Sequence, residues 1–114
     1  MTNPKEIQNI VNKIKSRRDT WVLSTRSKNL RTLSALGMDS DVLFDDIYHQ
    51  LSWRNYNSGP LMDDHTPPIP GDIWVFGLKI SDLDCYLKFQ DKPNGVIFWI
   101  SIHEQEYSMN LPFE

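Results

Sequence analysis

Three runs of sequence decide the fold, and all of them lie in the last third of the chain: IWVFGLKI (73–80), LDCYLKFQ (83–90) and GVIFWISIH (95–103). Each run is rich in β-branched and aromatic residues, which is typical of β-strands. Ser81-Asp82 predicts a tight turn after the first run, and Asn94-Gly95 predicts the hairpin before the third. Strands joined by such short turns form an antiparallel β-meander, so we expect a sheet over residues 73–103.

Upstream of these runs, apolar residues recur every three to four positions, which predicts helices. The expected helices cover residues 4–18, 25–36 and 40–51. Their apolar faces should be formed by Ile7, Ile10, Val11 and Ile14 in the first, Leu30, Leu33 and Leu36 in the second, and Val42, Leu43, Ile47 and Leu51 in the third. Asn3 is placed to cap the first helix, and Gly37 is placed to end the second in a left-handed conformation.

Helices followed by a sheet are the pattern of an α+β fold, in which three N-terminal helices pack on one face of the C-terminal antiparallel meander. A chain of 114 residues has the size of one domain, so we expect a single domain over 1–114. Residues 52–72 should form a long loop, because they contain four prolines and two glycines. Loops of that length are usually functional or disordered.

The composition excludes several classes of protein. The single Cys85 rules out an intrachain disulfide and a zinc site built from cysteines, and it fits a reducing compartment. No apolar run approaches the ~18 residues of a membrane span. The polar residues 1–19 lack the apolar stretch of a signal peptide. We therefore expect a soluble cytoplasmic protein.

Charge is distributed unevenly along the chain. Residues 1–31 carry eight Lys and Arg against two acidic residues, a net charge of +6, whereas residues 32–114 carry four against thirteen, a net charge of −9. A basic N-terminal segment is typical of proteins that meet a phosphate backbone or an acidic partner. It could equally neutralise the acidic remainder of its own domain, and the sequence leaves both interpretations open.

Alternation along the three expected strands predicts which side chains share a face of the sheet. Helices should cover the apolar face, which carries Cys85, Leu87 and Phe89 in the second strand and Phe98 and Ile100 in the third. The opposite, more polar face should carry Lys79, Tyr86, Lys88, Trp99, Ser101 and His103.

This polar set contains the groups that phosphodiester cleavage needs. A histidine can take or give a proton near neutral pH, and lysines can stabilise the charge that grows on a phosphate. Tyr86 can hydrogen-bond the phosphate, and Trp99 can stack on an unpaired base. The set requires neither a metal nor a cofactor. The solvated face of any antiparallel sheet also carries polar and aromatic residues, so periodicity alone leaves catalysis open.

Two other groups are weaker candidates for chemistry. Asp63, Asp64 and His65 in the loop could bind a metal in principle, but an acidic pair beside one histidine is more often simply solvated, so we expect no metal site. Cys85 belongs to the apolar face, where a thiol is usually inert. We therefore expect neither a metal ion nor a cysteine nucleophile to take part.

Several stretches of the chain, taken in order, point to a known family. They are 25–27 (TRS), 36–39 (LGMD), the Leu-Ser, Tyr and Gly-Pro of 51–60, 70–76 (PGDIWVF), 86–88 (YLK) and 101–107 (SIHEQEY). This ordered set resembles the MqsR (motility quorum-sensing regulator) type of toxin from bacterial toxin–antitoxin pairs, within the RelE-like fold. The resemblance covers most of residues 20–107.

The resemblance implies a metal-independent endoribonuclease that cleaves messenger RNA and arrests growth. Such an enzyme attacks with the 2′-hydroxyl of the RNA and leaves a cyclic phosphate. It is silenced by a cognate antitoxin, often with a helix-turn-helix DNA-binding part. Tyr86 and Lys88 match the family's Tyr-x-Lys strand, and His103 lies where other members have a lysine or a histidine. These three are the candidate catalytic residues.

One departure from the family concerns substrate binding. Many members have a lysine directly after the loop tyrosine, but here Tyr56 is followed by Asn57. Either this phosphate-binding cation is missing, or Arg54 serves in its place. The candidate substrate-binding residues are accordingly Lys79, Tyr56, Arg54 and Trp99.

Two functional hypotheses follow. The first is the ribonuclease toxin, which the clustered Lys79, Lys88 and His103 favour. The second is a non-catalytic module that uses the same sheet face and the basic N-terminal helix to hold a partner protein. The acidic total charge favours this second hypothesis, because RNA binding gains from positive charge. A DNA-binding regulator has little support, since no helix pair shows a recognition helix rich in base-reading side chains.

Overall fold

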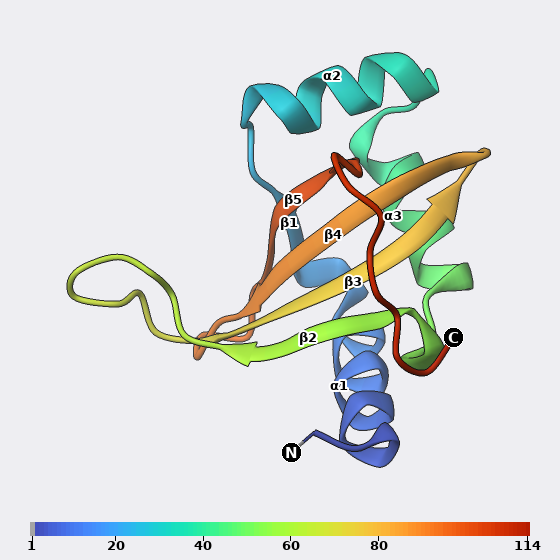
Figure 1. Cartoon of the computed structure of the whole chain (residues 1–114). Helices are drawn as coiled ribbons and strands as arrows, with labels where there is room; N and C mark the ends of the chain where they lie inside the picture. Colours follow the sequence, from blue (N-terminus) through green and yellow to red (C-terminus); the bar gives the residue numbers. More distant parts are fainter. Residues whose placement is uncertain (1) are drawn as a thin grey trace.

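The protein folds into three α-helices and one five-stranded sheet, as a computed structural model that describes residues 2–114 shows (Figure 1). The helices are α1 (Pro4–Ser16), α2 (Ser27–Leu36) and α3 (Ser40–Gln50). The strands are β1 (Trp21–Leu23), β2 (Tyr56–Leu61), β3 (Asp72–Ile80), β4 (Leu83–Asp91) and β5 (Ile97–Glu104). The α+β class expected from the sequence is confirmed.

The three expected helices are present, and their ends follow from local sequence. The Asn3 side chain accepts a hydrogen bond of 3.0 Å from the backbone N–H of Glu6 at the start of α1. Asp39 caps α3 in the same way by accepting from the N–H of Val42. Gly37 ends α2 at φ +65°, where a residue with a Cβ would be strained.

Helices α1 and α3 supply the helical half of the core. The buried residues are Ile7, Ile10, Val11 and Ile14 in α1, as expected, and Leu43, Phe44 and Ile47 in α3, followed by Leu51. Val42 is 47% exposed, so its expected place on the apolar face of α3 is wrong, and Phe44 is buried instead. No helix within residues 2–114 has the length and apolarity that crossing a membrane would require.

Helix α2 packs through both apolar and polar residues. Leu33 and Leu36 lie partly buried against the core, as expected, and only the expected place of Leu30 is wrong. Leu30 is 48% exposed, because the helix turns Asn29 and Thr32 toward the sheet instead. The Asn29 amide donates to the carbonyl of Ile100, and its oxygen accepts from the N–H of Ile102. These bonds satisfy a buried polar side chain and fix α2 against β5.

The sheet is mixed rather than antiparallel, which corrects the expected meander. Its order is β1-β5-β4-β3-β2, with β1 parallel to β5 and all other neighbours antiparallel. The three residues of β1 are too few to show a period, and Gly59 and Pro60 interrupt the pattern of β2. Both are edge strands, where proline is tolerated. The expected loop of 52–72 is thereby reduced to residues 62–71.

An extra residue in β5 reverses the alternation of this strand. Lys88 of β4 pairs with Ser101, but the next residue, Phe89, pairs with Trp99, so Ile100 has no partner in β4. Trp99 consequently faces the helices and is fully buried. The expectation that Trp99 lies on the polar face is wrong, because strict alternation fails across such an irregularity.

The same irregularity moves Phe98 to the face away from the helices. Phe98 pairs with Gln90 and is half-buried, whereas alternation predicts it under the helices. Ile100 is likewise only half-buried. Leu87 lies in the core and is fully buried, as expected. The sheet therefore presents a mixed apolar and charged surface on its second face.

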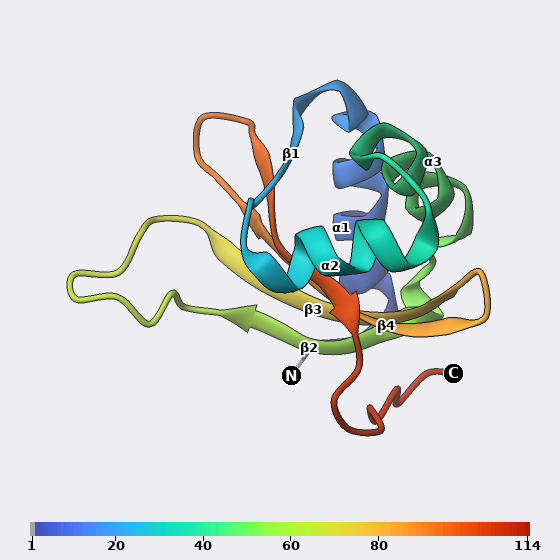
Figure 2. The ribbon, with the colours of Figure 1, turned by 90° about the horizontal axis from the view of Figure 1, so that it is seen from above.

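The helices and the C-terminal segment lie on opposite faces of the sheet (Figure 2). We call the face under α1 and α3 the core face and the other the cleft face. Residues 105–114 cross the cleft face, beginning where the N–H of Gln105 donates to the carbonyl of Asp84, 2.9 Å. A Cβ on Gly77 would lie 3.1 Å from the sulfur of Met109, so this glycine allows the segment to pass close to β3.

Candidate functional site

The cleft face holds a hollow of about 430 Å³, which we call the tail cleft because residues 105–110 form one of its walls. Strands β4 and β5, the connection from β1 to α2 and the first turn of α2 form most of the rest. The side chains that these elements contribute are Arg26, Lys28, Tyr86, Lys88, Ser101 and His103. The three candidate catalytic residues thus surround one hollow.

Strand pairing explains why these residues meet. Tyr86 lies directly opposite His103, and Lys88 lies directly opposite Ser101. Directly paired residues of adjacent strands project to the same side of a sheet. The Tyr86 and His103 rings stack with centroids 5.2 Å apart and an interplanar angle of 15°. The cleft therefore contains an imidazole, a phenol and an ammonium group on two neighbouring strands.

A hydrogen bond orients the His103 ring. Its Nδ1 lies 2.9 Å from the carbonyl oxygen of Glu104. A carbonyl only accepts, so Nδ1 carries the proton and donates it in this bond. In the neutral ring the lone pair then resides on Nε2. His103 is consequently arranged to take up a proton through Nε2.

Arg26 reaches the cleft from the end of the β1–α2 connection. Its Nη1 donates to the hydroxyl of the buried Ser101 at 2.9 Å, which holds the guanidinium over β5. Burial raises the pKa of Tyr86, while the positive charge of Arg26 opposes that rise. The phenol therefore remains protonated at neutral pH and can donate a hydrogen bond.

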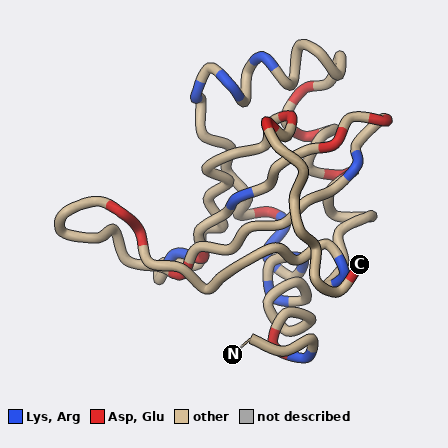
Figure 3. Tube along the Cα trace, viewed as in Figure 1, with Lys and Arg blue, Asp and Glu red and all other residues tan. Residues whose placement is uncertain are grey.

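The cations of the cleft differ in how far they are neutralised. Lys28 forms an ion pair with Glu106 of the C-terminal segment, and this contact lowers the pKa of that carboxyl. Lys88 is half-buried and has no ion-pair partner among residues 2–114. Figure 3 shows the positive segments of α2 and the middle of β4. Arg26 and Lys88 thus keep their charge available to an anion.

Two candidate substrate-binding cations lie outside the tail cleft. Lys79 is near the end of β3, with its Nζ 3.8 Å from a carboxylate oxygen of Asp84. The guanidinium of Arg54 lies 4.7 Å from the centroid of the Trp53 ring, in the turn before β2. Neither side chain lines the tail cleft. Arg26, which the sequence analysis did not select, is a cation that does line the tail cleft.

The two candidate aromatic residues are packed in the interior. Trp99 is fully buried and its ring centroid lies 5.1 Å from that of Phe89 on the core face. Tyr56 is 8% exposed, and its hydroxyl donates to the carbonyl oxygen of Gly59 at 2.6 Å. Their expected roles in binding substrate are therefore not supported by their positions, since neither ring is accessible to a base from the cleft face.

Residues 62–71 arch over the remaining part of the cleft face and enclose a second hollow of about 350 Å³. We call this second hollow the loop pocket. Phe98 and Ile100 form apolar parts of its wall. Arg26 and Lys88 line both the loop pocket and the tail cleft. The two hollows are therefore adjacent, with these cations at their junction.

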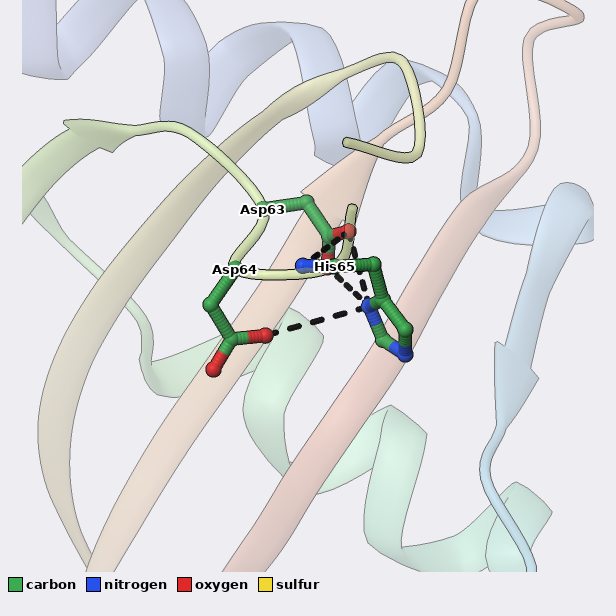
Figure 4. A group of neighbouring side chains, drawn as sticks. All are labelled: Asp63, Asp64 and His65. Atoms are coloured by element: carbon green, nitrogen blue, oxygen red, sulfur yellow. Dashed lines mark hydrogen bonds and ion pairs between the residues drawn. The ribbon is translucent and has the colours of Figure 1, made fainter. Parts of the chain in front are cut away.

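The acidic loop group is held together by internal hydrogen bonds (Figure 4). One oxygen of Asp63 accepts from the backbone N–H groups of His65 and Ile69, at 3.1 and 2.9 Å. The bond from Ile69 is the main reason that the pKa of Asp63 falls to about 2. The Asp63 carboxylate in turn raises the pKa of His65. Asp63, Asp64 and His65 could each offer a metal one ligand atom, but these bonds also explain the group as a loop-stabilising device.

The basic N-terminal helix pairs with acids of its own domain. Lys13 and Arg17 lie 2.6 and 3.7 Å from carboxylate oxygens of Asp91. Arg18, just after α1, lies 2.9 Å from Asp45 of α3. Of the two interpretations of the charge asymmetry, these contacts support internal neutralisation.

Cys85 is fully buried on the core face, as expected. Burial raises the pKa of its thiol to about 11, so the thiolate is scarce at neutral pH. A nucleophilic role is disfavoured on both grounds.

Sequence reasoning missed Arg26 and the wall formed by the C-terminal segment. Arg26 reaches the cleft because β1 pairs in parallel with β5. The residues that follow β1 therefore lie beside the next part of β5, where Arg26 contacts Ser101. The run 20–23 (TWVL), rich in β-branched and aromatic residues, is the signal that could have revealed this strand. Residues 105–114 carry no comparable signal, because they are held by contacts with distant strands.

Comparison of the chain with protein-family models, with curated proteins and with solved structures found no match. The functional interpretation therefore depends on the cleft itself and on the motifs that line it.

Proposed function

We propose that the protein is a metal-independent endoribonuclease, the toxin of a type II toxin–antitoxin pair, which cleaves messenger RNA in the cytoplasm. The observation that carries this proposal is the convergence of His103, Tyr86 and Lys88 on one hollow, with Arg26 beside them. This set combines a proton acceptor, a hydrogen-bond donor and two cations, which is what cleavage of RNA by its own 2′-hydroxyl requires.

The first role is proton transfer by His103. Nε2 takes the proton of the 2′-hydroxyl as the 2′-oxygen attacks the neighbouring phosphorus. The bond from phosphorus to the 5′-oxygen then breaks, and the imidazolium returns its proton to that leaving oxygen. The products are a 2′,3′-cyclic phosphate and a 5′-hydroxyl, so atoms and protons balance without a metal ion.

The second role is stabilisation of the negative charge that grows on the phosphate. Lys88 and Arg26 can approach the non-bridging oxygens, because neither forms an ion pair with a carboxylate of residues 2–114. Tyr86 donates a hydrogen bond to the same phosphate, since its raised pKa keeps the phenol protonated. Removal of one well-placed charge-stabilising donor typically costs about 10²–10³ in rate, and we expect a loss of this size for Lys88.

The resemblance to MqsR-type toxins supports the same function and suggests a RelE-like fold. Three of the motifs that carry the resemblance line the tail cleft, namely 25–27, 86–88 and 101–107. The layout, with helices on one face of the sheet and the C-terminal segment and tail cleft on the other, agrees with that proposal. We further propose, from the resemblance, a cognate antitoxin with a helix-turn-helix DNA-binding part.

The alternative function is a non-catalytic module that binds a partner protein. That hypothesis uses the cleft face together with the basic N-terminal helix. The pairing of Lys13 and Arg17 with Asp91 leaves that helix with less free charge for a partner. The uncompensated Lys88 within a hollow is explained better by a phosphate ligand, and it favours the enzyme.

Controlled expression in bacteria tests the proposal. Wild type should arrest growth and degrade messenger RNA into fragments that end in a 2′,3′-cyclic phosphate. His103→Ala should relieve both effects, because loss of a positioned proton-transfer group costs about 10²–10⁴ in rate. His49→Ala is the matched control, since this exposed histidine lies on α3 and contacts its own helix.

The proteins should be compared at equal soluble levels and with matching circular dichroism spectra. Growth arrest by His49→Ala but not by His103→Ala supports the enzyme. Normal growth and intact messenger RNA with wild type, or full toxicity of a folded His103→Ala, would reject it. Binding of a partner protein without any RNA cleavage would favour the binding module.

A further inference from the structure

We propose that the loop pocket is a nucleobase-binding subsite, which holds the base of the nucleotide on one side of the scissile phosphate. This inference rests on the ribonuclease function proposed above and names the part of the RNA that the second hollow receives. The ligand of the pocket is thus a neutral aromatic ring rather than a phosphate or a metal ion.

The position of the pocket relative to the tail cleft is the first argument. Arg26 and Lys88 line both hollows. A phosphate bound between these two cations therefore has the tail cleft on one side and the loop pocket on the other. A dinucleotide has the same arrangement, because one phosphate separates two bases. The geometry assigns one hollow to each base.

The wall of the pocket is the second argument. Phe98 is a half-buried aromatic residue on the cleft face, where the irregularity in β5 places it opposite Gln90. Ile73 and Ile100 lie in the same pocket and extend the apolar surface. Every base has a π-face, so an accessible aromatic ring binds bases with little regard to sequence. Phe98 takes the stacking role for which Trp99 is too deeply buried.

The rim of the pocket provides a cation above this ring. The Nζ of Lys92 lies 4.9 Å from the centroid of Phe98. A cation–π contact at an exposed site is weak, and the lysine side chain is long and flexible. A base can therefore replace the ammonium group over the ring, while Lys92 turns to the phosphate of the next nucleotide.

The roof of the pocket is held in place without a ligand. The Gln90 amide donates to the carbonyl oxygens of Ile69 and Gly71, at 3.0 and 3.1 Å. Asp63 accepts from the N–H groups of His65 and Ile69. These bonds tie both ends of the loop to each other and to β4. A preformed pocket loses less conformational freedom when it binds.

The charged side chains of the pocket favour the base of a nucleotide over its phosphate. Asp63 and Asp64 line it, and their carboxylates repel a phosphate. A neutral base meets no such repulsion. Arg26 and Lys88 line the tail cleft as well, so they mark the place where the two hollows meet. The phosphate is therefore directed to the junction, and the base is directed under the loop.

A binding experiment tests the aromatic wall. The probe is a fluorescent 2′-O-methyl RNA hexamer of mixed sequence, which lacks the 2′-hydroxyl needed for cleavage. Phe98→Ala should weaken its binding about 5- to 100-fold, the loss expected when stacking on one base is removed. Phe98→Tyr should restore it. Tyr48→Ala is the control, because that aromatic side chain is partly exposed on α3, over the core face.

A cleavage experiment places the base relative to the phosphate. The substrate is a DNA oligonucleotide with a single ribonucleotide, so that only one phosphate can be cut. In two further substrates only a base is removed: either from the ribonucleotide on the 5′ side of that phosphate, whose 2′-hydroxyl is kept, or from the deoxynucleotide on its 3′ side. Phe98→Ala should lower kcat/KM for the intact substrate and for one abasic substrate. For the other it should have no effect, because the base that stacks is absent.

The outcomes separate this inference from the proposed function. If wild type cleaves RNA but Phe98→Ala, folded as judged by its unfolding midpoint, binds and cleaves like wild type, the subsite is wrong and the enzyme stands. If wild type binds the hexamer through Phe98 but cleaves nothing, the proposed function fails and base binding stands. Equal effects of Phe98→Ala on both abasic substrates would also overturn the subsite.

Discussion

The two faces of the sheet are built from the same strands but are closed in different ways. On the core face, α1 and α3 cover the sheet, and Leu87, Phe89 and Trp99 are fully buried. On the cleft face, the irregular segments 62–71 and 105–114 cross the strands and leave hollows, among them the tail cleft and the loop pocket. Each strand therefore contributes to stability through one face and, in the proposed function, to chemistry through the other. Substitutions should separate these contributions.

The largest effect on stability is expected from the core face. Trp99→Ala should lower the free energy of unfolding by about 3–5 kcal/mol, because it leaves a large cavity among packed rings. Urea denaturation measures this change. Trp99→Phe should cost less, since it keeps part of the ring and removes an indole N–H that has no hydrogen-bond partner within residues 2–114.

The neighbouring residue provides the contrast between the faces. Phe98→Ala should destabilise the protein less than Trp99→Ala, because Phe98 is already partly exposed on the cleft face. Equal losses for the two substitutions would mean that the irregularity at Ile100 does not separate them. Phe98 and Trp99 would then not lie on faces that differ in packing.

After His103, the largest effect on activity is expected from Lys88. Lys88→Ala should lower kcat/KM for RNA cleavage about 10²- to 10³-fold, since it removes a charge-stabilising group from the junction of the hollows. The unfolding midpoint should change little. Lys79→Ala is the matched control, because Lys79 points to the cleft face from β3 but lies beside Asp84, outside the tail cleft. Similar losses for both lysines would show that the cleft is misplaced.

A smaller loss is expected from Arg26, which approaches the cleft from outside the central strands. Arg26→Ala should reduce kcat/KM about 10- to 100-fold, the range for a hydrogen bond to a charged group. Arg26→Lys should recover part of it by keeping the charge. Arg31→Ala serves as a control on the exposed side of α2. Full activity of Arg26→Ala would remove this residue from the site.

The helices and central strands could be predicted because their signals are local. The stripe from Ile7 to Ile14 and the Asn94-Gly95 turn are each encoded within a few neighbouring residues. Strands β1 and β2 could not be predicted, because their structure comes from pairing with β5 and β3, which are distant in sequence. Propensity is weakest for such short edge strands.

The candidate site was predictable only where alternation held. Tyr86, Lys88 and His103 meet because they lie on the regular side of the irregularity in β5. Trp99 lies beyond it and was placed on the wrong face. Nothing in residues 97–104 (IFWISIHE) marks Ile100 as the extra residue, since the whole run is apolar on both faces as far as that point. Register is set by the partner strand and the core.

The stability of the loop 62–71 should depend on pH, because the titratable pair Asp63 and His65 holds it together. The pKa of Asp63 is lowered to about 2. The carboxylate therefore stabilises the loop fully when the pH is above the ordinary pKa of an aspartate, and this contribution is lost as the pH falls through about 2. The raised pKa of His65 gives the opposite sign: its contribution is complete below its ordinary pKa and is lost as pH rises through the folded value. The ion pair of Asp63 and His65 should therefore stabilise the loop most between about pH 4 and 6.5.

An NMR titration of the His65 ring checks this linkage. Asp63→Asn should lower the pKa of His65, because the charged partner of Nδ1 is removed. Asp46→Asn, on α3, should leave the His65 titration where it is. A His65 titration that is identical in wild type and Asp63→Asn would show that the two side chains do not interact in solution.

The smallest effect is expected from removing metal ions. RNA cleavage should survive EDTA, because proton transfer and charge stabilisation are assigned to His103, Lys88 and Arg26 rather than to a cation. Asp63 already accepts hydrogen bonds from the loop backbone, and His65 Nδ1 is turned toward it. A metal bound there would have to compete with those bonds. Loss of cleavage in EDTA that Mg²⁺ or Mn²⁺ restores, and that Asp64→Asn abolishes, would instead move catalysis from the tail cleft to the loop. The contrast between a packed core face and a chemically active cleft face would remain, but its active part would be the loop pocket.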